Sequence, residues 1–294
     1  MMKTEADVVL RCEATLGEGA LWDDRRERLL WVDILLKQVG VFDPGTGKNE
    51  SFAVDSPVGT VVPSNQGDLM VALQAGFARL DITTGVRSHC IVPPGHDATR
   101  LRFNDGKCDP SGRFWAGTMA LDGRGNEGAL YSLDADGQMR KRFSPVGISN
   151  GIAWSKDGTK MYYIDTPTRS VAEFQYDPGT GDLTDRKVAI EFPPSLGWPD
   201  GMTIDAEGML WIAFWDGSAV SRWDPNTGKK LSQYSFPATR VTACALGGSD
   251  LDTLYVTSAR IGLTDAQLEA QPLAGSIFAV RTNTTGISAF RYAG

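Results

Sequence analysis

The sequence predicts an all-β protein, a six-bladed β-propeller with four-stranded blades around a central channel. The first observation is a short apolar or aromatic run that recurs six times, about 45 residues apart, through the 294-residue chain. The second is a cluster of Gly, Asp and Asn residues before each run, because these residues favour tight turns. The third is that the repeats lack helical periodicity and have the pattern of short strands. A sandwich or jelly roll would not explain this recurrence, so we expect residues 1–294 to form one propeller domain.

The apolar runs mark one strand of each expected blade. In chain order they are Leu29–Trp31, Leu69–Val71, Phe114–Ala116, Met161–Tyr163, Leu210–Ile212 and Leu254–Val256. Another strand is expected to begin about ten residues before each run, and an alternating segment such as Val39–Pro44 follows most of them. One helix is expected at Thr264–Gln271, because Thr264 and Gln267 can form a capping box and Pro272 stops the helix. We expect Val8–Cys12 to supply a strand to the last blade and so close the ring.

The charge balance and the apolar runs argue against several classes of protein. The chain has 29 Lys+Arg and 36 Asp+Glu, a net charge of −7, which argues against binding to nucleic acid. Its longest apolar run, residues 29–36, contains Asp33 and is too short to cross a membrane. Residues 1–7 lack the pattern of a signal peptide.

The cysteines and histidines argue against several kinds of site. The four cysteines form no C-x-x-C pair and fit buried thiols in a reducing, cytoplasmic compartment; they are Cys12, Cys90, Cys108 and Cys244. The two histidines, His89 and His96, flank a Pro/Gly-rich stretch and are expected to be exposed loop residues. That placement disfavours a Ser-His-Asp triad or a His-rich metal site.

Four oxygen-bearing residues fall at the same phase of the repeat. Glu18, Asn104, Asn150 and Asp200 lie close to glycines where the innermost strands are expected to begin. Equivalent positions of the inner strands form a ring, so the repeat would bring these residues to one end of the channel. Two carboxylates and two amides suit a hard or borderline divalent cation better than a dedicated zinc site. Taken singly, each Asn-Gly or Asp-Gly pair is more often an ordinary turn, and it is their shared phase that favours a site.

Six short motifs resemble the regucalcin (senescence marker protein)/gluconolactonase family. They occur in the family's order and span the chain from about Leu16 to Phe278. They are Leu16–Trp22, Arg102–Lys107, Ala116–Met119, Gly128–Tyr131, Ser149–Trp154 and Pro199–Met202, with Ser258–Arg260 and Gly275–Phe278 fitting in the tail.

The resemblance implies a six-bladed propeller that holds one divalent cation in its channel and hydrolyses sugar-acid lactones. Glu18, Asn150 and Asp200 match the family's three metal ligands, and Arg102 and Asn104 match its substrate-contacting pair. Ca²⁺ is the favoured ion, while Mg²⁺, Mn²⁺, Fe²⁺ and Zn²⁺ stay open.

The resemblance also points to positions at the channel mouth. Asp122 matches, by count, an acidic residue after the Gly-Thr-Met motif, although the family often has two glutamates where this chain has Leu121 and Asp122. Trp198 would form an apolar wall for a sugar face or, equally, pack as a buried tryptophan. Asp165 could support a ligand, but a turn-stabilising aspartate is the better interpretation.

The expected function is metal-dependent hydrolysis of aldonolactones, such as glucono-, galactono-, xylono- or arabinono-lactone, by a carboxylic-ester hydrolase. The cation would polarise the carbonyl and acidify a water. Arg102 would hold sugar hydroxyls, and Asn104 would donate to the oxyanion. Asp200 is either the general base or only a ligand that orients the water, because coordination to a cation weakens its basicity.

Two other functions fit the same pattern. A phosphotriester or organophosphate hydrolase could use the same cation to polarise a phosphoryl oxygen. A propeller without enzymatic activity could bind a metal in its channel or a protein on its rim. In each case we expect a monomer, because a closed ring leaves few free strand edges.

Overall fold

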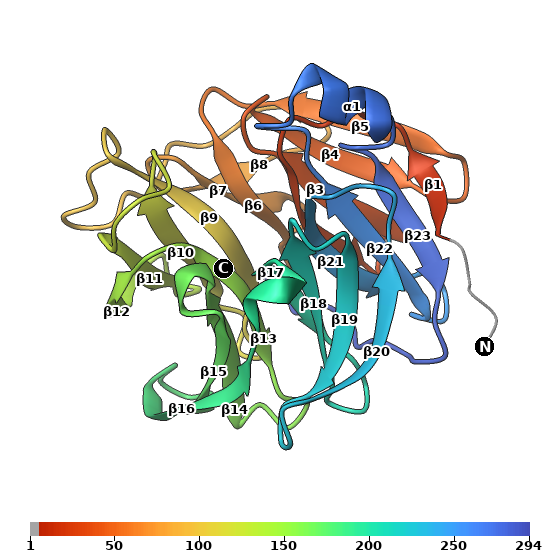
Figure 1. Cartoon of the computed structure of the whole chain (residues 1–294). Helices are drawn as coiled ribbons and strands as arrows, with labels where there is room; N and C mark the ends of the chain where they lie inside the picture. Colours follow the sequence, from red (N-terminus) through yellow and green to blue (C-terminus); the bar gives the residue numbers. More distant parts are fainter. Residues whose placement is uncertain (1–5) are drawn as a thin grey trace.

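Six antiparallel β-sheets surround a central channel in the computed structural model, which describes residues 6–294 (Figure 1). Five sheets have four strands and one has three. The predicted six-bladed propeller is therefore confirmed. Residues 1–5, most of the segment considered for a signal peptide, lie outside the described residues.

Each blade is built from strands that follow one another along the chain, apart from the strand that closes the ring. The innermost strands are β2 (Gly17–Asp23), β6 (Val58–Pro63), β9 (Leu101–Cys108), β13 (Ser149–Trp154), β17 (Trp198–Ile204) and β21 (Val241–Gly247). The predicted apolar runs lie in the second strands, which are β3 (Arg28–Asp33), β7 (Leu69–Leu73), β10 (Phe114–Ala120), β14 (Lys160–Asp165), β18 (Leu210–Trp215) and β22 (Thr253–Ser258).

The third strands are mostly buried, whereas the fourth strands are more polar and more exposed. The third strands are β4 (Gln38–Asp43), β8 (Phe77–Leu80), β11 (Gly128–Leu133), β15 (Ser170–Tyr176), β19 (Ala219–Asp224) and β23 (Ile277–Arg281). The fourth strands are β5 (Lys48–Ala53), β12 (Met139–Val146), β16 (Leu183–Glu191), β20 (Lys229–Ser235) and β1 (Asp7–Leu10). The core lies between neighbouring blades, where apolar side chains of the inner three strands pack face to face.

The second blade lacks a regular fourth strand. After β8 the chain makes only two isolated bridges to it, at Arg87 and Ile91. Pro93 and Pro94 follow two residues later and have no N–H to donate, so the pairing with β8 cannot continue past Ile91. This blade departs from the four-stranded pattern that the sequence predicts for all six.

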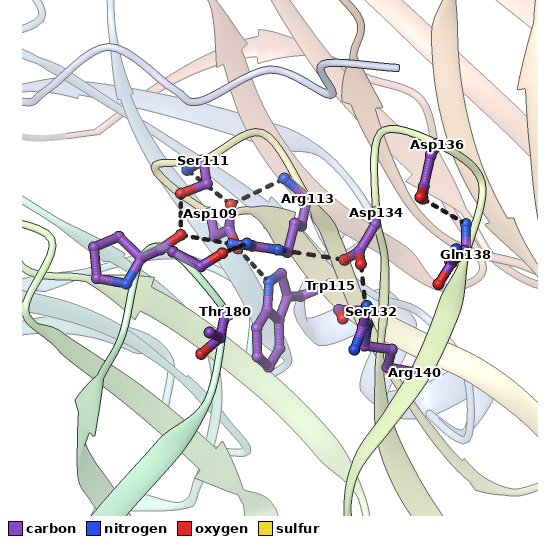
Figure 2. Close-up of polar contacts among 12 residues, drawn as sticks. Asp109, Ser111, Arg113, Trp115, Ser132, Asp134, Asp136, Gln138, Arg140 and Thr180 are labelled. Carbon is purple, nitrogen blue, oxygen red and sulfur yellow. Dashed lines mark hydrogen bonds and ion pairs between the residues drawn. The ribbon is translucent and has the colours of Figure 1, made fainter.

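Buried aspartates hold the turns between first and second strands, as predicted for these Asp/Gly clusters. Asp109 directly follows β9, and its carboxylate accepts hydrogen bonds from the Ser111 and Arg113 backbone and from Trp115 Nε1 (Figure 2). Asp205 does the same after β17, with Trp211 Nε1 at 2.9 Å. The repeated aspartate thus fixes the turn and orients the aromatic residue of the next strand.

The ring closes where the sequence places the closing strand. β1 pairs antiparallel with β23, so the N-terminal segment completes the last blade. The strand covers Asp7–Leu10 and ends before Cys12. Closure therefore joins the two ends of the chain by main-chain hydrogen bonds.

A second closing element, not predicted from the sequence, is the C-terminal segment that follows β23. Residues 285–293 cross the far end of the channel and contact the turns of five blades. Tyr292 exchanges backbone hydrogen bonds with Pro63 and Asn65, and Arg291 pairs with buried Asp23 and with Asp24. We call residues 285–293 the C-terminal strap.

The described residues also form one short α-helix. α1 (Asp265–Ala270) has Thr264 as its N-cap and the predicted capping box with Gln267, and it lies between β22 and β23. No helix in residues 6–294 is long and apolar enough to cross a membrane.

Two expectations about individual residues were only half right. Cys108 and Cys244 are buried, but Cys12 and Cys90 are only half-buried; all four are free thiols. His89 is exposed as predicted, whereas His96 is half-buried against Phe103, and its Nε2 bonds the Gln74 carbonyl at 2.8 Å. The loop before β9 folds over the blade, a tertiary contact that local composition does not reveal.

Candidate active site

The inner strands all bulge at the level of the candidate residues. The register with the second strand shifts between Glu18 and Leu21 in β2, between Ser149 and Ile152 in β13, and between Pro199 and Met202 in β17. The other three inner strands shift at equivalent places. A bulge frees residues from the ladder and re-aims their side chains. The Asn-Gly and Asp-Gly pairs are therefore strand bulges and not turns.

Glycines allow neighbouring bulges to come together. A Cβ on Gly151 would lie 2.8 Å from the Asp200 carbonyl oxygen, and one on Gly201 would lie 2.9 Å from the Thr242 carbonyl oxygen. These contacts are too close for any side chain. Gly151 thus sets how closely the strand of Asn150 approaches the strand that carries Asp200, and Gly201 sets how closely that strand approaches β21.

A chain of hydrogen bonds links the substrate pair to a candidate ligand. Arg102 Nη1 donates to Asn104 Oδ1 at 2.6 Å and to the Phe103 carbonyl at 3.0 Å. Asn104 Nδ2 donates in turn to the Ser149 carbonyl at 2.8 Å and to Asn150 Oδ1 at 3.2 Å. Both amide protons of Asn104 are engaged, so donation to an oxyanion would require its longer bond, to Asn150, to break.

Thr166 fixes which way the Asn150 amide faces. The Thr166 hydroxyl donates its one proton to the Pro199 carbonyl at 2.8 Å, so toward Asn150 it can only accept. Asn150 Nδ2 donates to it at 2.8 Å. Asn150 Oδ1 must therefore point away from Thr166, toward Asn104 and the channel.

Three carboxylates, of Glu18, Asp105 and Asp200, lie within reach of the positive charges of Arg102 and Lys107. Burial raises the pKa of Glu18 to about 8, with a further rise from the charge of Asp105. Burial also raises the pKa of Asp200 well above its ordinary value, and the charges of Glu18 and Asp105 add to this. Desolvation lowers the pKa of Arg102 to about 10, against the pull of Glu18 and Asp200. These mutual effects show that the buried groups lie within reach of one another's charge.

Two of the three carboxylates have an oxygen without a partner. Asp200 Oδ1 and Asp105 Oδ2 are buried and make no hydrogen bond to the described residues. Asp105 Oδ1 accepts only from the Gly106 backbone, at 2.7 Å. Burial raises the pKa of Asp105, and the positive charge of Lys107 opposes the rise. Unpaired buried carboxylate oxygens are costly unless a cation or a ligand completes them.

The donor set fits a divalent cation. No three His, Cys, Asp or Glu side chains of residues 6–294 converge closely enough to share one ion, so a site here would depend on the Asn150 amide oxygen. Glu18 and Asp200 supply carboxylate oxygens, and Thr166 turns Asn150 Oδ1 in the same direction. Oxygen donors of this kind suit hard cations. Asp105 then contributes negative charge beside the ligands.

The other end of the channel is closed. A cavity of about 60 Å³ lies there between Lys107, Trp154, Thr203 and residues 287–290 of the C-terminal strap. Lys107 Nζ donates to the Met202 carbonyl. Glu18, Asn150 and Asp200 lie toward the opposite ends of their strands, away from the C-terminal strap.

The structure does not bring Asp122 to the other candidates. Asp122 lies on the exposed turn after β10, and its carboxylate accepts from the Arg124 backbone at 2.9 Å. Asp165 accepts from the Gly147 and Ile148 backbone, which makes it the turn-stabilising aspartate of the preferred interpretation.

Trp198 is neither a bare apolar wall nor a buried residue. Its side chain is 40% exposed at the start of β17. The Arg169 guanidinium carbon lies 3.6 Å from the centre of its ring. One face of the ring is therefore covered by a cation.

Three residues of the site escaped the sequence analysis. Asp105 and Lys107 were visible in the Arg102–Lys107 motif, next to Asn104, and alternation along an inner strand could have placed them in the channel. Thr166 gave no signal, because it follows the second strand and reaches Asn150 only through the fold.

Comparison with known proteins points to one family. Residues 16–260 match the family described as the SMP-30/Gluconolactonase/LRE-like region. The Bacillus subtilis (strain 168) protein named "Putative sugar lactone lactonase YvrE" is 40% identical over 290 residues, 98% of this chain and 99% of that one. Regucalcin from Danio rerio is 39% identical over 297 residues, covering 100% of both chains.

A solved structure extends the likeness to three dimensions. It is described as regucalcin, a calcium-binding protein from Agrobacterium tumefaciens, and it is 29% identical with a TM-score of 0.93. The alignment covers 98% of this chain and 97% of that one.

Proposed function

The chain belongs to the SMP-30/gluconolactonase/LRE-like family, and on that premise we propose that it is a hydrolase that opens sugar lactones to their acids. One observation carries the proposal. Glu18 and Asp200, whose pKa values are raised by burial, lie beside Arg102 at the end of the channel opposite the C-terminal strap. The lactonase name of a relative that is 40% identical over nearly the whole chain supports the substrate class.

Glu18, Asn150 and Asp200 would hold a divalent cation, and Ca²⁺ is the ion that we favour. Their oxygen donors suit Ca²⁺, Mg²⁺ and Mn²⁺ better than Fe²⁺ or Zn²⁺. A cation bound there would act as a Lewis acid on the lactone carbonyl. The "calcium-binding" description of the regucalcin structure agrees with this assignment. Loading the site would also reverse the raised pKa values, because a positive charge favours the ionised carboxylates.

Arg102 is placed to bind the substrate. Its Nη1 is used by Phe103 and Asn104, which fixes the plane of the guanidinium and leaves Nη2 and Nε for sugar oxygens. Asn104 acts through its neighbours, because it accepts from Arg102 and holds Asn150. We therefore place Arg102 on the substrate and Asn104 as the link that aligns Arg102 with Asn150.

Asp200 is the proposed proton acceptor. Water attacks the lactone carbonyl carbon, and Asp200 Oδ1, which has no partner among the described residues, takes a proton from it. The bond from that carbon to the ring oxygen then breaks. The ring oxygen takes the proton back and becomes a hydroxyl, so the sugar acid leaves and Asp200 is regenerated.

The test is acid release by metal-stripped protein, followed with a pH indicator. Glucono-, galactono-, xylono- and arabinono-lactone are each offered with Ca²⁺, Mg²⁺, Mn²⁺, Fe²⁺ or Zn²⁺ added separately, against blanks with metal alone. Release above the blanks with one cation supports the proposal. No release in any combination refutes it and makes phosphotriester substrates the next ones to offer.

Two variants separate the roles of Asp200. Asp200→Asn keeps an oxygen donor and removes the base, so it should still bind the cation by calorimetry while turnover falls by about a hundredfold or more. Asp200→Ala should lose both. Asp250→Asn, on an exposed carboxylate far from the site, is the control and should match the wild type. Full turnover by Asp200→Asn would leave Asp200 a ligand only.

A further inference from the structure

Arg169 stands at the mouth of the candidate site. It directly follows η1 (Thr166–Thr168), whose first residue bonds both Asn150 and the strand that carries Asp200. Its guanidinium carbon lies 3.6 Å from the centre of the ring of Trp198, two residues before Asp200, and its Nη1 donates to the Gly197 carbonyl at 2.7 Å. The cation is thus held in one position at the rim between the fourth and fifth blades.

Arg169 has no acidic partner. No carboxylate of residues 6–294 lies within 4 Å of it, whereas most arginines of this acidic chain are in ion pairs. Arg240 gives the closest comparison. It lies over Trp215, which pairs with Trp198 across the same blade, yet Asp216 neutralises it at 3.3 Å. Of these two stacked arginines at one rim, only Arg169 has donors left for an anion.

A guanidinium fixed on an aromatic ring suits an anionic ligand. Its planar fork matches the oxygens of a carboxylate or phosphate, and a fixed fork loses little freedom on binding. One N–H serves Gly197, so the other edge of the fork remains available. In a chain of net charge −7, an unpaired cation beside the site also attracts anions selectively.

We propose that Arg169 is a specificity residue that binds a carboxylate or phosphate substituent of the substrate, so that the preferred substrates are sugar lactones carrying a negative charge away from the reacting ester. This inference rests on the proposed lactonase function. Trp198 would then hold Arg169 in position and would not form the apolar wall expected from the sequence.

The test compares two substrates that differ at one end. The γ-lactone of D-glucaric acid carries a terminal carboxylate where the γ-lactone of D-gluconic acid carries a hydroxymethyl group. The ratio of their kcat/KM values is measured for the wild type, Arg169→Gln and Arg169→Lys. Arg240→Gln is the matched control, since it removes a stacked rim arginine that is already paired.

The expected result is a preference of the wild type for the glucaric lactone that falls roughly tenfold in Arg169→Gln, mainly through KM. Arg169→Lys should retain part of the preference, and Arg240→Gln all of it. Added salt should reduce the preference of the wild type. Equal effects of Arg169→Gln on both lactones, or no effect on either, would overturn the inference.

A binding measurement keeps the inference separate from the proposed function. The affinities of D-glucarate and D-gluconate are measured by calorimetry. Even if neither lactone is hydrolysed, the wild type should bind D-glucarate more tightly, and Arg169→Gln should lose the difference. Identical affinities in the two proteins would refute a role of Arg169 in anion binding, whereas failed hydrolysis alone would refute only the lactonase proposal.

Discussion

Replacing Thr166 with valine removes one hydroxyl and keeps the volume of the side chain. The hydroxyl makes two bonds of 2.8 Å, accepting from Asn150 Nδ2 and donating to the Pro199 carbonyl. Thr166 is 8% exposed, so water cannot readily replace it. The variant therefore leaves a buried donor and a buried acceptor unpaired.

The size of the effect follows from those two bonds. An unpaired buried polar group costs about 1–3 kcal/mol, and the two groups here can partly relax, so the free energy of unfolding should fall by about 2–3 kcal/mol. Cation affinity should fall by roughly ten- to a hundredfold, as it does when a group that orients a ligand is removed. The reason is that Asn150 can then turn its NH₂ group into the channel.

Calorimetric titration with Ca²⁺ and the other candidate ions measures the affinity, and urea unfolding measures the stability. Thr118→Val is the control, because Thr118 is fully buried and its hydroxyl also has two partners, both on Ala129. It should lose comparable stability and keep its cation affinity. If Thr166→Val binds the ion as tightly as the wild type, while Asn150→Ala does not bind it, Thr166 does not orient the ligand.

Two further predictions concern pH and the C-terminal strap. In metal-stripped protein the pKa of Glu18 is raised from 4.5 to about 8, so its contribution to stability is present at low pH and lost as pH rises through that interval. The Tm should fall accordingly, and Glu18→Gln or a bound divalent cation should flatten the fall. Arg291→Met removes one of the two arginines on buried Asp23 and should lower the free energy of unfolding by about 1–3 kcal/mol in urea titrations. Arg281→Met breaks an exposed ion pair and should change the free energy of unfolding little. If Arg291→Met lowers it no more than Arg281→Met does, the contact between Arg291 and Asp23 does not stabilise the strap.

The sequence predicts the propeller well because one repeat is read six times. A turn that is assigned wrongly in one unit does not change the predicted fold, because the other five units show the same spacing. The same phase predicts the candidate site, since Glu18, Asn104, Asn150 and Asp200 all fall in the bulges of inner strands. The family resemblance adds Arg102, whose guanidinium bonds Asn104.

The parts that could not be predicted lie outside the repeat. The C-terminal strap has no counterpart in earlier units, so the sequence repeat does not predict it. Thr166 and Arg169 lie on one short turn, and Arg169 reaches Trp198 because its backbone adopts a left-handed conformation with a φ of 51°.

Burial alone did not distinguish structural aspartates from functional ones, but hydrogen bonding does. Asp109 and Asp205 are fully buried at the closed end of the channel, and backbone N–H groups, a tryptophan and an arginine complete each carboxylate. Asp105 and Asp200 are almost as buried at the opposite end, yet each keeps an oxygen without a partner among residues 6–294.

The cost of those unpaired oxygens is the physical argument for function at that end. The charge of Asp105 raises the pKa of Glu18 and of Asp200, and the charge of Glu18 adds to the rise at Asp200, which destabilises the folded chain as long as nothing binds there. The fold completes the same type of side chain with arginine and tryptophan partners at the opposite end. A protein that completes buried aspartates at one end and leaves Asp105 and Asp200 with unpaired oxygens at the other has a site that a cation and its substrate are expected to complete.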